Sequence, residues 1–96
     1  MAPLTQIDIT EHLQKLEGWA IEDGALQKVF VFAGFPEAVA FVGRLVSDAE
    51  SADHHPDIAI NYRRVTLRWT THSEGGLTLK DFDGARMADR RMAPGG

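Results

Sequence analysis

The chain contains no cysteine. Disulfides, thiolate nucleophiles and thiolate metal sites are therefore excluded, and nothing in the sequence indicates an oxidising compartment. No apolar run approaches the roughly 20 residues that a membrane-spanning helix needs. The first six residues, Met-Ala-Pro-Leu-Thr-Gln, also lack the basic and apolar regions of a secretory signal. We therefore expect a soluble, cytoplasmic protein without membrane contact.

Basic residues are also few: 10 lysines and arginines stand against 14 acidic residues, for a net charge of -4. Direct nucleic-acid binding is not expected, because it requires a basic surface that displaces counterions. The 96 residues, of which 44% are hydrophobic and 25% charged, predict one domain covering residues 1–96. A core of this size is modest, and burial against a second copy would supplement it. We therefore expect an oligomer.

Hydrophobic periodicity and turn signals predict five elements in the order helix, hairpin, helix, hairpin, helix. Such an order favours an α+β fold in which a four-stranded antiparallel sheet carries its helices on one face. The first helix has two candidate N-caps, Thr5 and Asp8, and the last has Thr78 as its N-cap with Asp81 at the third position. The predicted elements are a helix ending at Gly18, strands near 19–22 and 25–32, a helix from about 35 to 53, strands near 57–62 and 65–70, and a helix from about 78, with a disordered tail at 92–96.

The central helix is predicted to be the main core helix, because its apolar residues recur at helical spacing. The stripe consists of Phe35, Val39, Val42, Val46 and Ala49, widened by Ala38, Phe41 and Leu45. Gly43 inside this helix indicates close packing against another element. In the strand before it, Leu26, Phe30 and Phe32 share one face and Val29 and Val31 the other, so both faces are expected to be covered. His12 lies off the apolar stripe of the first helix and is expected to face solvent.

Two adjacent histidines, His54 and His55, follow the central helix and precede Pro56. Histidine changes charge near neutral pH, so this pair is a candidate for proton transfer. Side chains diverge by about 100° in a helix and about 180° in a strand, and Pro56 breaks that regularity at His55, which allows the rings to converge. His72 at the end of a strand and Asp81 at the start of a helix occupy similar junctions, where functional groups concentrate.

Other chemistries are less compatible with these residues. Adjacent histidines rarely chelate one metal ion, and no His-x-x-x-His spacing occurs on a helix. Nucleophilic catalysis lacks both a cysteine and a Gly-x-Ser-x-Gly turn. For each histidine considered alone, the alternative is an exposed surface residue with no chemical role.

One stretch and the residues that follow it closely resemble the pterin-4a-carbinolamine dehydratases. The similarity covers nearly the whole chain. It includes Ala49-Glu50-x-x-Asp53-His54-His55-Pro56 and, at unbroken spacing, Tyr62, Val65, Thr71-His72, Gly76-Leu77-Thr78 and Asp81, together with Leu4-Thr5, Leu13, Leu16, Gly18-Trp19, Phe30, Phe32 and Phe35 in the N-terminal half.

The resemblance implies a function and a site. Members of that family dehydrate 4a-hydroxytetrahydropterin to quinonoid dihydropterin, a recycling step after aromatic amino-acid hydroxylation, without a metal or bound cofactor. Their fold is a four-stranded antiparallel sheet with three helices on one side, assembled as dimers or tetramers. Carried over by position, His54, His55 and His72 would form the active site and Asp81 would support it, and which ring acts as acid and which as base stays open.

Three residues are weaker candidates for binding the pterin. These are Glu50, Trp19 and Lys80, whose ordinary roles would be a solvated helix end, a core residue and a solvated charge. The alternative function is a non-catalytic binding module with a protein partner, because relatives act as coactivators or assembly factors on the same fold. The sequence departs from the family at Gly84, where leucine is usual, and at Ile60, a commonly polar position. We expect Gly84 to weaken the last helix.

Overall fold

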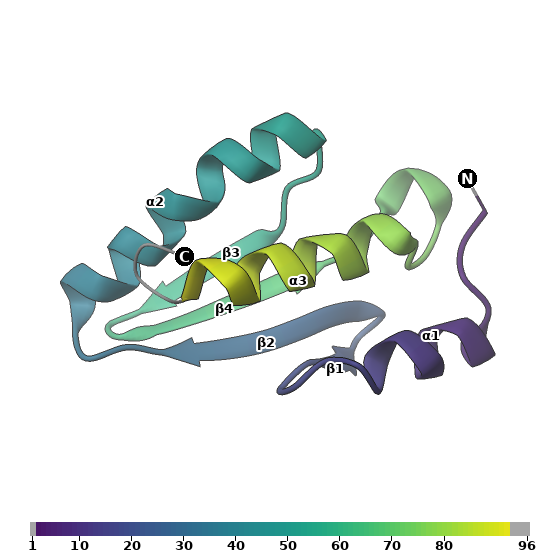
Figure 1. Ribbon diagram of the computed structural model, residues 1–96, viewed down its shortest axis with the longest axis horizontal. Helices are drawn as coiled ribbons and strands as arrows, with labels where there is room; N and C mark the ends of the chain where they lie inside the picture. The colour runs from purple at the N-terminus through teal and green to yellow at the C-terminus, as the bar shows by residue number, and fades with distance from the viewer. Residues whose placement is uncertain (1, 93–96) are drawn as a thin grey trace.

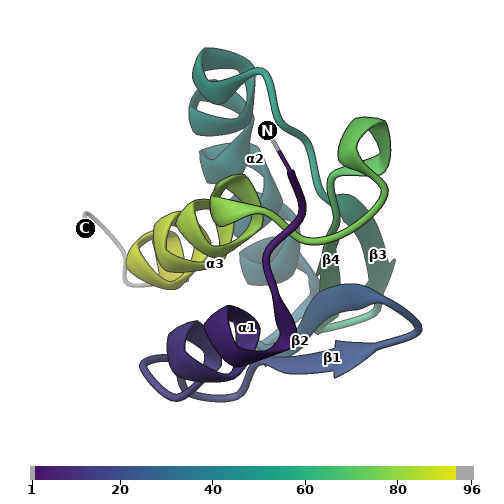
Figure 2. The same ribbon diagram turned by 90° about the vertical axis from the view of Figure 1, so that its right-hand side faces the viewer.

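The structure, a computed structural model that describes residues 2–92, contains one antiparallel sheet with three helices on one of its faces (Figures 1 and 2). The strand order is β1-β2-β4-β3, and every neighbouring pair is antiparallel. This confirms the predicted α+β fold and the order of its elements. The elements are α1 (Gln6–Leu13), β1 (Ala20–Glu22), β2 (Ala25–Val31), α2 (Phe35–Ala52), β3 (Asp57–Asn61), β4 (Arg64–Trp69), the short 3-10 turn η1 (His72–Glu74) and α3 (Leu79–Met92).

Two helix starts follow local capping chemistry. The Thr5 hydroxyl accepts a hydrogen bond from the Asp8 backbone N–H at 3.2 Å and caps α1, which confirms Thr5 as an N-cap. Asp8 lies inside the helix, so the prediction that it is also an N-cap is wrong. At α3 the Thr78 hydroxyl accepts from the Lys80 N–H at 3.3 Å, and the Asp81 carboxylate accepts from the Thr78 N–H at 3.0 Å. This reciprocal arrangement is a capping box and confirms the predicted helix start.

The core lies between the inner face of the sheet and helices α2 and α3. A β-carbon placed on Gly84 of α3 would sit 2.7 Å from the ring of Trp69, so only glycine lets the helix approach this side chain so closely. Gly84 was expected to weaken α3, and the structure shows that it is also a packing contact with Trp69. The most deeply buried residues include Leu26, Phe30, Val65, Leu67 and Trp69 of the sheet, Ala38, Phe41 and Leu45 of α2, and Phe82, Ala85 and Ala88 of α3.

The apolar stripe predicted on α2 is only partly buried. Phe35, Val39 and Val46 are 52%, 43% and 57% exposed. The buried side of α2 is instead formed by Ala38, Phe41, Leu45 and Ala49. The apolar face of α2 is broader than the surface that the sheet and α3 offer it. Gly43 was predicted to pack closely and does not, since a β-carbon there would meet nothing within 4 Å.

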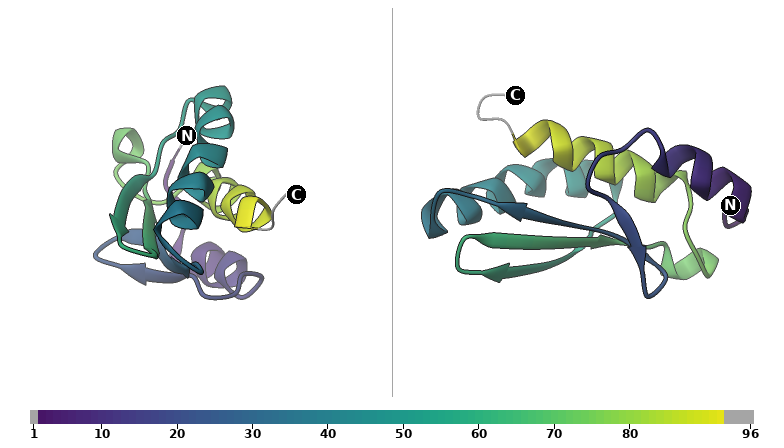
Figure 3. Two further views of the ribbon diagram at one scale, coloured as in Figure 1. Left: turned by 90° about the vertical axis from the view of Figure 1, so that its left-hand side faces the viewer. Right: turned by 90° about the horizontal axis from the view of Figure 1, so that it is seen from below.

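Other local expectations are also corrected. Val29 and Val31 of β2 are exposed, because all the helices lie on the opposite face of the sheet (Figure 3). His12 is half-buried, with its ring 5.2 Å from that of Phe82. Met92, which was assigned to a tail, is the last residue of α3, and residues 93–96 of that tail lie outside the described part of the chain.

The C-terminal half of α3 is tied to its neighbours by charged pairs. Arg91 donates from Nε to Asp48 of α2 at 2.7 Å. This hydrogen bond and the opposite charge lower the pKa of Asp48 and raise the pKa of Arg91. On the other side of the helix, Asp89 accepts from Lys28 Nζ at 2.8 Å and from the indole N–H of Trp19. Helix α3 is thereby held between α2 and the first hairpin.

Candidate active site

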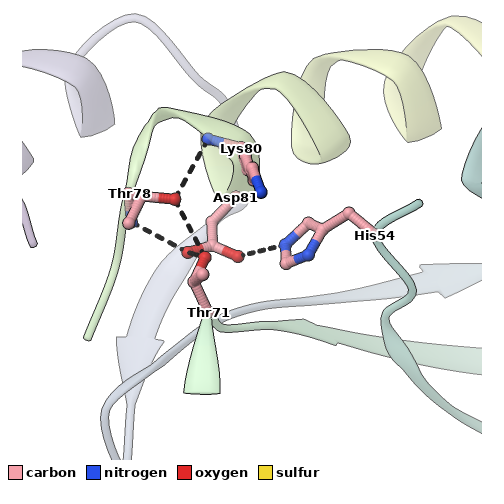
Figure 4. Close-up of polar contacts among 5 residues, drawn as sticks. All are labelled: His54, Thr71, Thr78, Lys80 and Asp81. Atoms are coloured by element: carbon pink, nitrogen blue, oxygen red, sulfur yellow. Dashed lines mark hydrogen bonds and ion pairs between the residues drawn. The ribbon is translucent and has the colours of Figure 1, made fainter. Parts of the chain in front are cut away.

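His54 lies where the chain leaves α2. Asp53 adopts a left-handed conformation with φ of 50° and ends the helix, and the His54 N–H bonds back to the Ala49 carbonyl at 3.2 Å. This reversal places the imidazole at the start of α3, where Nε2 is 2.7 Å from Asp81 Oδ1 (Figure 4). The ring also stacks on the indole of Trp69, with 5.4 Å between centroids. The His54 side chain is 12% exposed and that of Asp81 is fully buried.

The Asp81 carboxylate is surrounded by hydrogen-bond partners (Figure 4). Oδ2 accepts from the Thr71 hydroxyl at 2.8 Å and from the Thr78 N–H at 3.0 Å, while Oδ1 faces His54. The hydroxyls of Thr71 and Thr78 are themselves 2.9 Å apart. Burying a charged group is costly unless it is fully hydrogen-bonded, and here both oxygens have partners. The carboxylate therefore joins the end of α2, the segment after β4 and the start of α3.

His55 has a different environment. Its Nε2 pairs with Glu50 Oε2, and the two side chains are 53% and 69% exposed. Residues 54–56 have no regular secondary structure, as expected from Pro56. The two adjacent imidazoles therefore have separate carboxylate partners, one buried and one at the surface.

His72 was predicted to close the last strand, but β4 ends at Trp69 and His72 is the first residue of η1. It is exposed and lines a hollow of about 420 Å³ together with Asp57, Arg68 and Thr70. His54 lines a second hollow, of about 390 Å³, between α2 and α3, and His55 lines a third, of about 200 Å³. The segment that links α2 to β3 lies at the same end of the sheet as η1 (Figures 1 and 2).

The three weaker candidates for pterin binding lie in different environments. Trp19 is buried and bonded to Asp89, away from all three of these hollows, which makes it a core residue. Lys80 is exposed and lines the hollow of His54, and Glu50 lines that of His55.

Sequence reasoning missed the polar role of the two threonines and the stacking of Trp69 on His54. Thr78 was interpreted only as a helix cap and Thr71 only as the end of a strand. The signal that was available is the presence of two hydroxyl residues close to a buried acid.

Residues 2–92 lack two features that would indicate other classes of protein. No group of three or more histidine, aspartate or glutamate residues in this range is arranged to hold a metal ion. None of the helices described here has both the length and the apolar character needed to cross a membrane.

Comparison with known proteins identifies the family. Residues 2–91 match the family described as pterin 4 alpha carbinolamine dehydratase. The chain belongs to this family. Within the dehydratase family, a Nostoc sp. protein named as a pterin-4-alpha-carbinolamine dehydratase is 51% identical over 83% of this chain and 86% of its own. A Picosynechococcus sp. protein of the same name is 48% identical over 91% and 95%.

A solved structure shares the fold. It is that of a transcriptional coactivator/pterin dehydratase from Brucella melitensis, which superposes with a TM-score of 0.90 and is 34% identical, covering 95% of this chain and 99% of its own.

Proposed function

We propose that this protein dehydrates 4a-hydroxytetrahydropterin to quinonoid dihydropterin in tetrahydropterin recycling. The observation that carries the proposal is membership of the dehydratase family over residues 2–91, with His54, His55, His72 and Asp81 all present. The substrate would be a reduced pterin with a hydroxyl on C4a. The reaction would need no metal or bound cofactor.

The chemistry requires two proton transfers. One proton must reach the C4a hydroxyl, which leaves as water, and one must leave N5 so that the C4a–N5 double bond forms. Imidazoles can perform both transfers near neutral pH. We assign them to His54, His55 and His72, with Asp81 orienting His54 and Glu50 orienting His55. The exposure of His55 and His72 and the two carboxylate–imidazole contacts support this assignment.

The direct test is stopped-flow measurement of carbinolamine dehydration with the purified protein. We expect a rate proportional to protein concentration and well above the buffer-catalysed rate. If the protein gives no acceleration, the enzymatic proposal fails. The second candidate, a non-catalytic binding module, would then be preferred, because the similar Brucella protein is named a coactivator as well as a dehydratase.

We also propose that the protein associates with a second copy of itself through an apolar surface. This surface consists of Phe35, Val39 and Val46 of α2 with Ile58 and Ile60 of β3, all exposed. Val46 and Ile58 line the same hollow as His55, and β3 is an edge strand with one side unpaired in the sheet. A second copy bound there would exclude water from this apolar surface and would form one side of the hollow that His55 lines.

Changing both Val39 and Val46 to glutamate should convert an oligomer into a monomer, because charged side chains would have to be buried at the interface. Sedimentation equilibrium would report the mass of each variant. Val29→Glu is the matched control, since Val29 is similarly exposed but points away from the helix-covered face of the sheet, to which its buried neighbour Phe30 belongs. A wild-type monomer, or an oligomer unaffected by the double change, would exclude this surface.

A further inference from the structure

The hydrogen bonds around Asp81 constrain where their protons lie. The Thr71 hydroxyl donates its single proton to Asp81 Oδ2, so it must accept the hydrogen bond in its contact with the Thr78 hydroxyl. Thr78 is then the donor in that contact, and its oxygen is free to accept from the Lys80 N–H, as observed. Each proton in this series of hydrogen bonds is therefore directed towards the Asp81 carboxylate.

The same directions bear on the tautomer of His54. Two donors, the Thr71 hydroxyl and the Thr78 N–H, already point at Asp81 Oδ2, so Oδ1 is the oxygen left to accept from His54. An ionised carboxylate can only accept hydrogen bonds. The proton in the contact at 2.7 Å between Asp81 Oδ1 and His54 therefore belongs to Nε2 of the imidazole.

Once Nε2–H is committed to Asp81, Nδ1 is the one ring nitrogen of His54 left for a ligand. Nδ1 has no hydrogen-bond partner among the described residues. If it were fully buried, it would be a buried polar atom without a partner, but among these residues Trp69 Nε1 is the single atom of that kind. Nδ1 is therefore not sealed inside the protein. The imidazole borders the hollow of about 390 Å³ between α2 and α3, and stacking on Trp69 restricts the plane of its ring.

We propose that Thr71 and Thr78 are positioning residues that hold His54 in the Nε2–H tautomer, so that His54 exchanges protons with substrate through Nδ1. Neither threonine needs to touch the substrate, because both act through Asp81. The kinetic part rests on the proposed dehydratase function, whereas the tautomer does not.

The test uses ¹⁵N-histidine-labelled protein, in which ring-nitrogen chemical shifts distinguish the two tautomers. The variants are Thr71→Ser, which keeps the hydroxyl, and Thr71→Val, which removes it at nearly constant shape. His54→Gln identifies the His54 signals. We expect the Nε2–H form in the wild type and in Thr71→Ser, and a mixture of tautomers in Thr71→Val. We also expect kcat of Thr71→Val to fall about tenfold relative to Thr71→Ser, with a displaced pH profile.

Two controls separate positioning from folding. Thr66→Val makes the same change on β4 at a residue outside the network and should alter neither the spectrum nor the pH profile. Thr78→Val and Thr78→Ser repeat the test if Thr71→Val does not fold.

The tautomer and the activity of the variants together decide between positioning and other roles for the two threonines. A wild-type Nδ1–H form, or a Thr71→Val protein with an unchanged tautomer and pH profile, would overturn the proposal even if its activity fell. If the wild type showed no dehydratase activity but Thr71→Val still changed the tautomer, the proposed function would fail and the positioning role would stand.

Discussion

Replacing His55 or His72 by alanine should lower kcat/KM for carbinolamine dehydration by about 100-fold each, because each lost proton transfer removes a contribution of that order. Both side chains are exposed, so thermal unfolding should change little. His54→Ala should reduce stability as well as activity, because it leaves the buried Asp81 carboxylate without one of its partners. Steady-state kinetics and thermal unfolding on the same preparations measure both effects.

His12→Gln is the matched control for these variants. It removes the fourth histidine, which packs against Phe82 away from the three hollows, and should leave the rate unchanged. Full activity in all three alanine variants would exclude histidine acid–base catalysis. A similar loss in His12→Gln would show that the measurement reports folding rather than chemistry.

Gly84→Ala should destabilise the protein by about 1–3 kcal/mol, the usual cost of overfilling a packed core. The added β-carbon would lie within 2.8 Å of three atoms of the Trp69 ring, which is almost completely buried. Gly84→Leu should be more damaging still. Urea unfolding of each variant gives the free energies.

Gly43→Ala is the control of opposite sign. Its β-carbon meets nothing, so the change should stabilise α2 by about 1 kcal/mol through helix propensity alone. The double variant Trp69→Leu/Gly84→Leu should recover much of the stability lost in Gly84→Leu, which a double-mutant cycle would measure as a coupling energy. Equal stabilisation by Gly84→Ala and Gly43→Ala would mean that the contact with Trp69 is not tight.

The fold was predictable because its signals are local. Alternation of apolar residues marked the strands, turn signals marked the hairpins, and the Thr78–Asp81 capping box marked the start of α3. The covered part of α2 was not predictable, since an apolar stripe records hydrophobicity and not which neighbour covers it. Phe35, Val39 and Val46 fit the helical period well and are nevertheless exposed within the chain.

The candidate site was predictable in its residues but not in its arrangement. Similarity to a family indicated His54 and Asp81 without showing that they contact each other. Thr71 and Thr78 each had a sufficient local explanation, so no local signal showed that their hydroxyls meet at the same carboxylate. Gly84 resembled a defect for the same reason, because its partner Trp69 lies on another element.

The contact between Trp69 and Gly84 also restricts how the sequence can diverge. Leucine at position 84 would overlap the indole and destabilise the protein strongly, whereas loss of the indole first leaves only a cavity, which a folded chain can tolerate at a lower cost. Substitution along this pair therefore has a preferred order, with position 69 changing before position 84. Descendants of a protein with this pair should accordingly include forms with a small residue at both positions, and these intermediates would record the path.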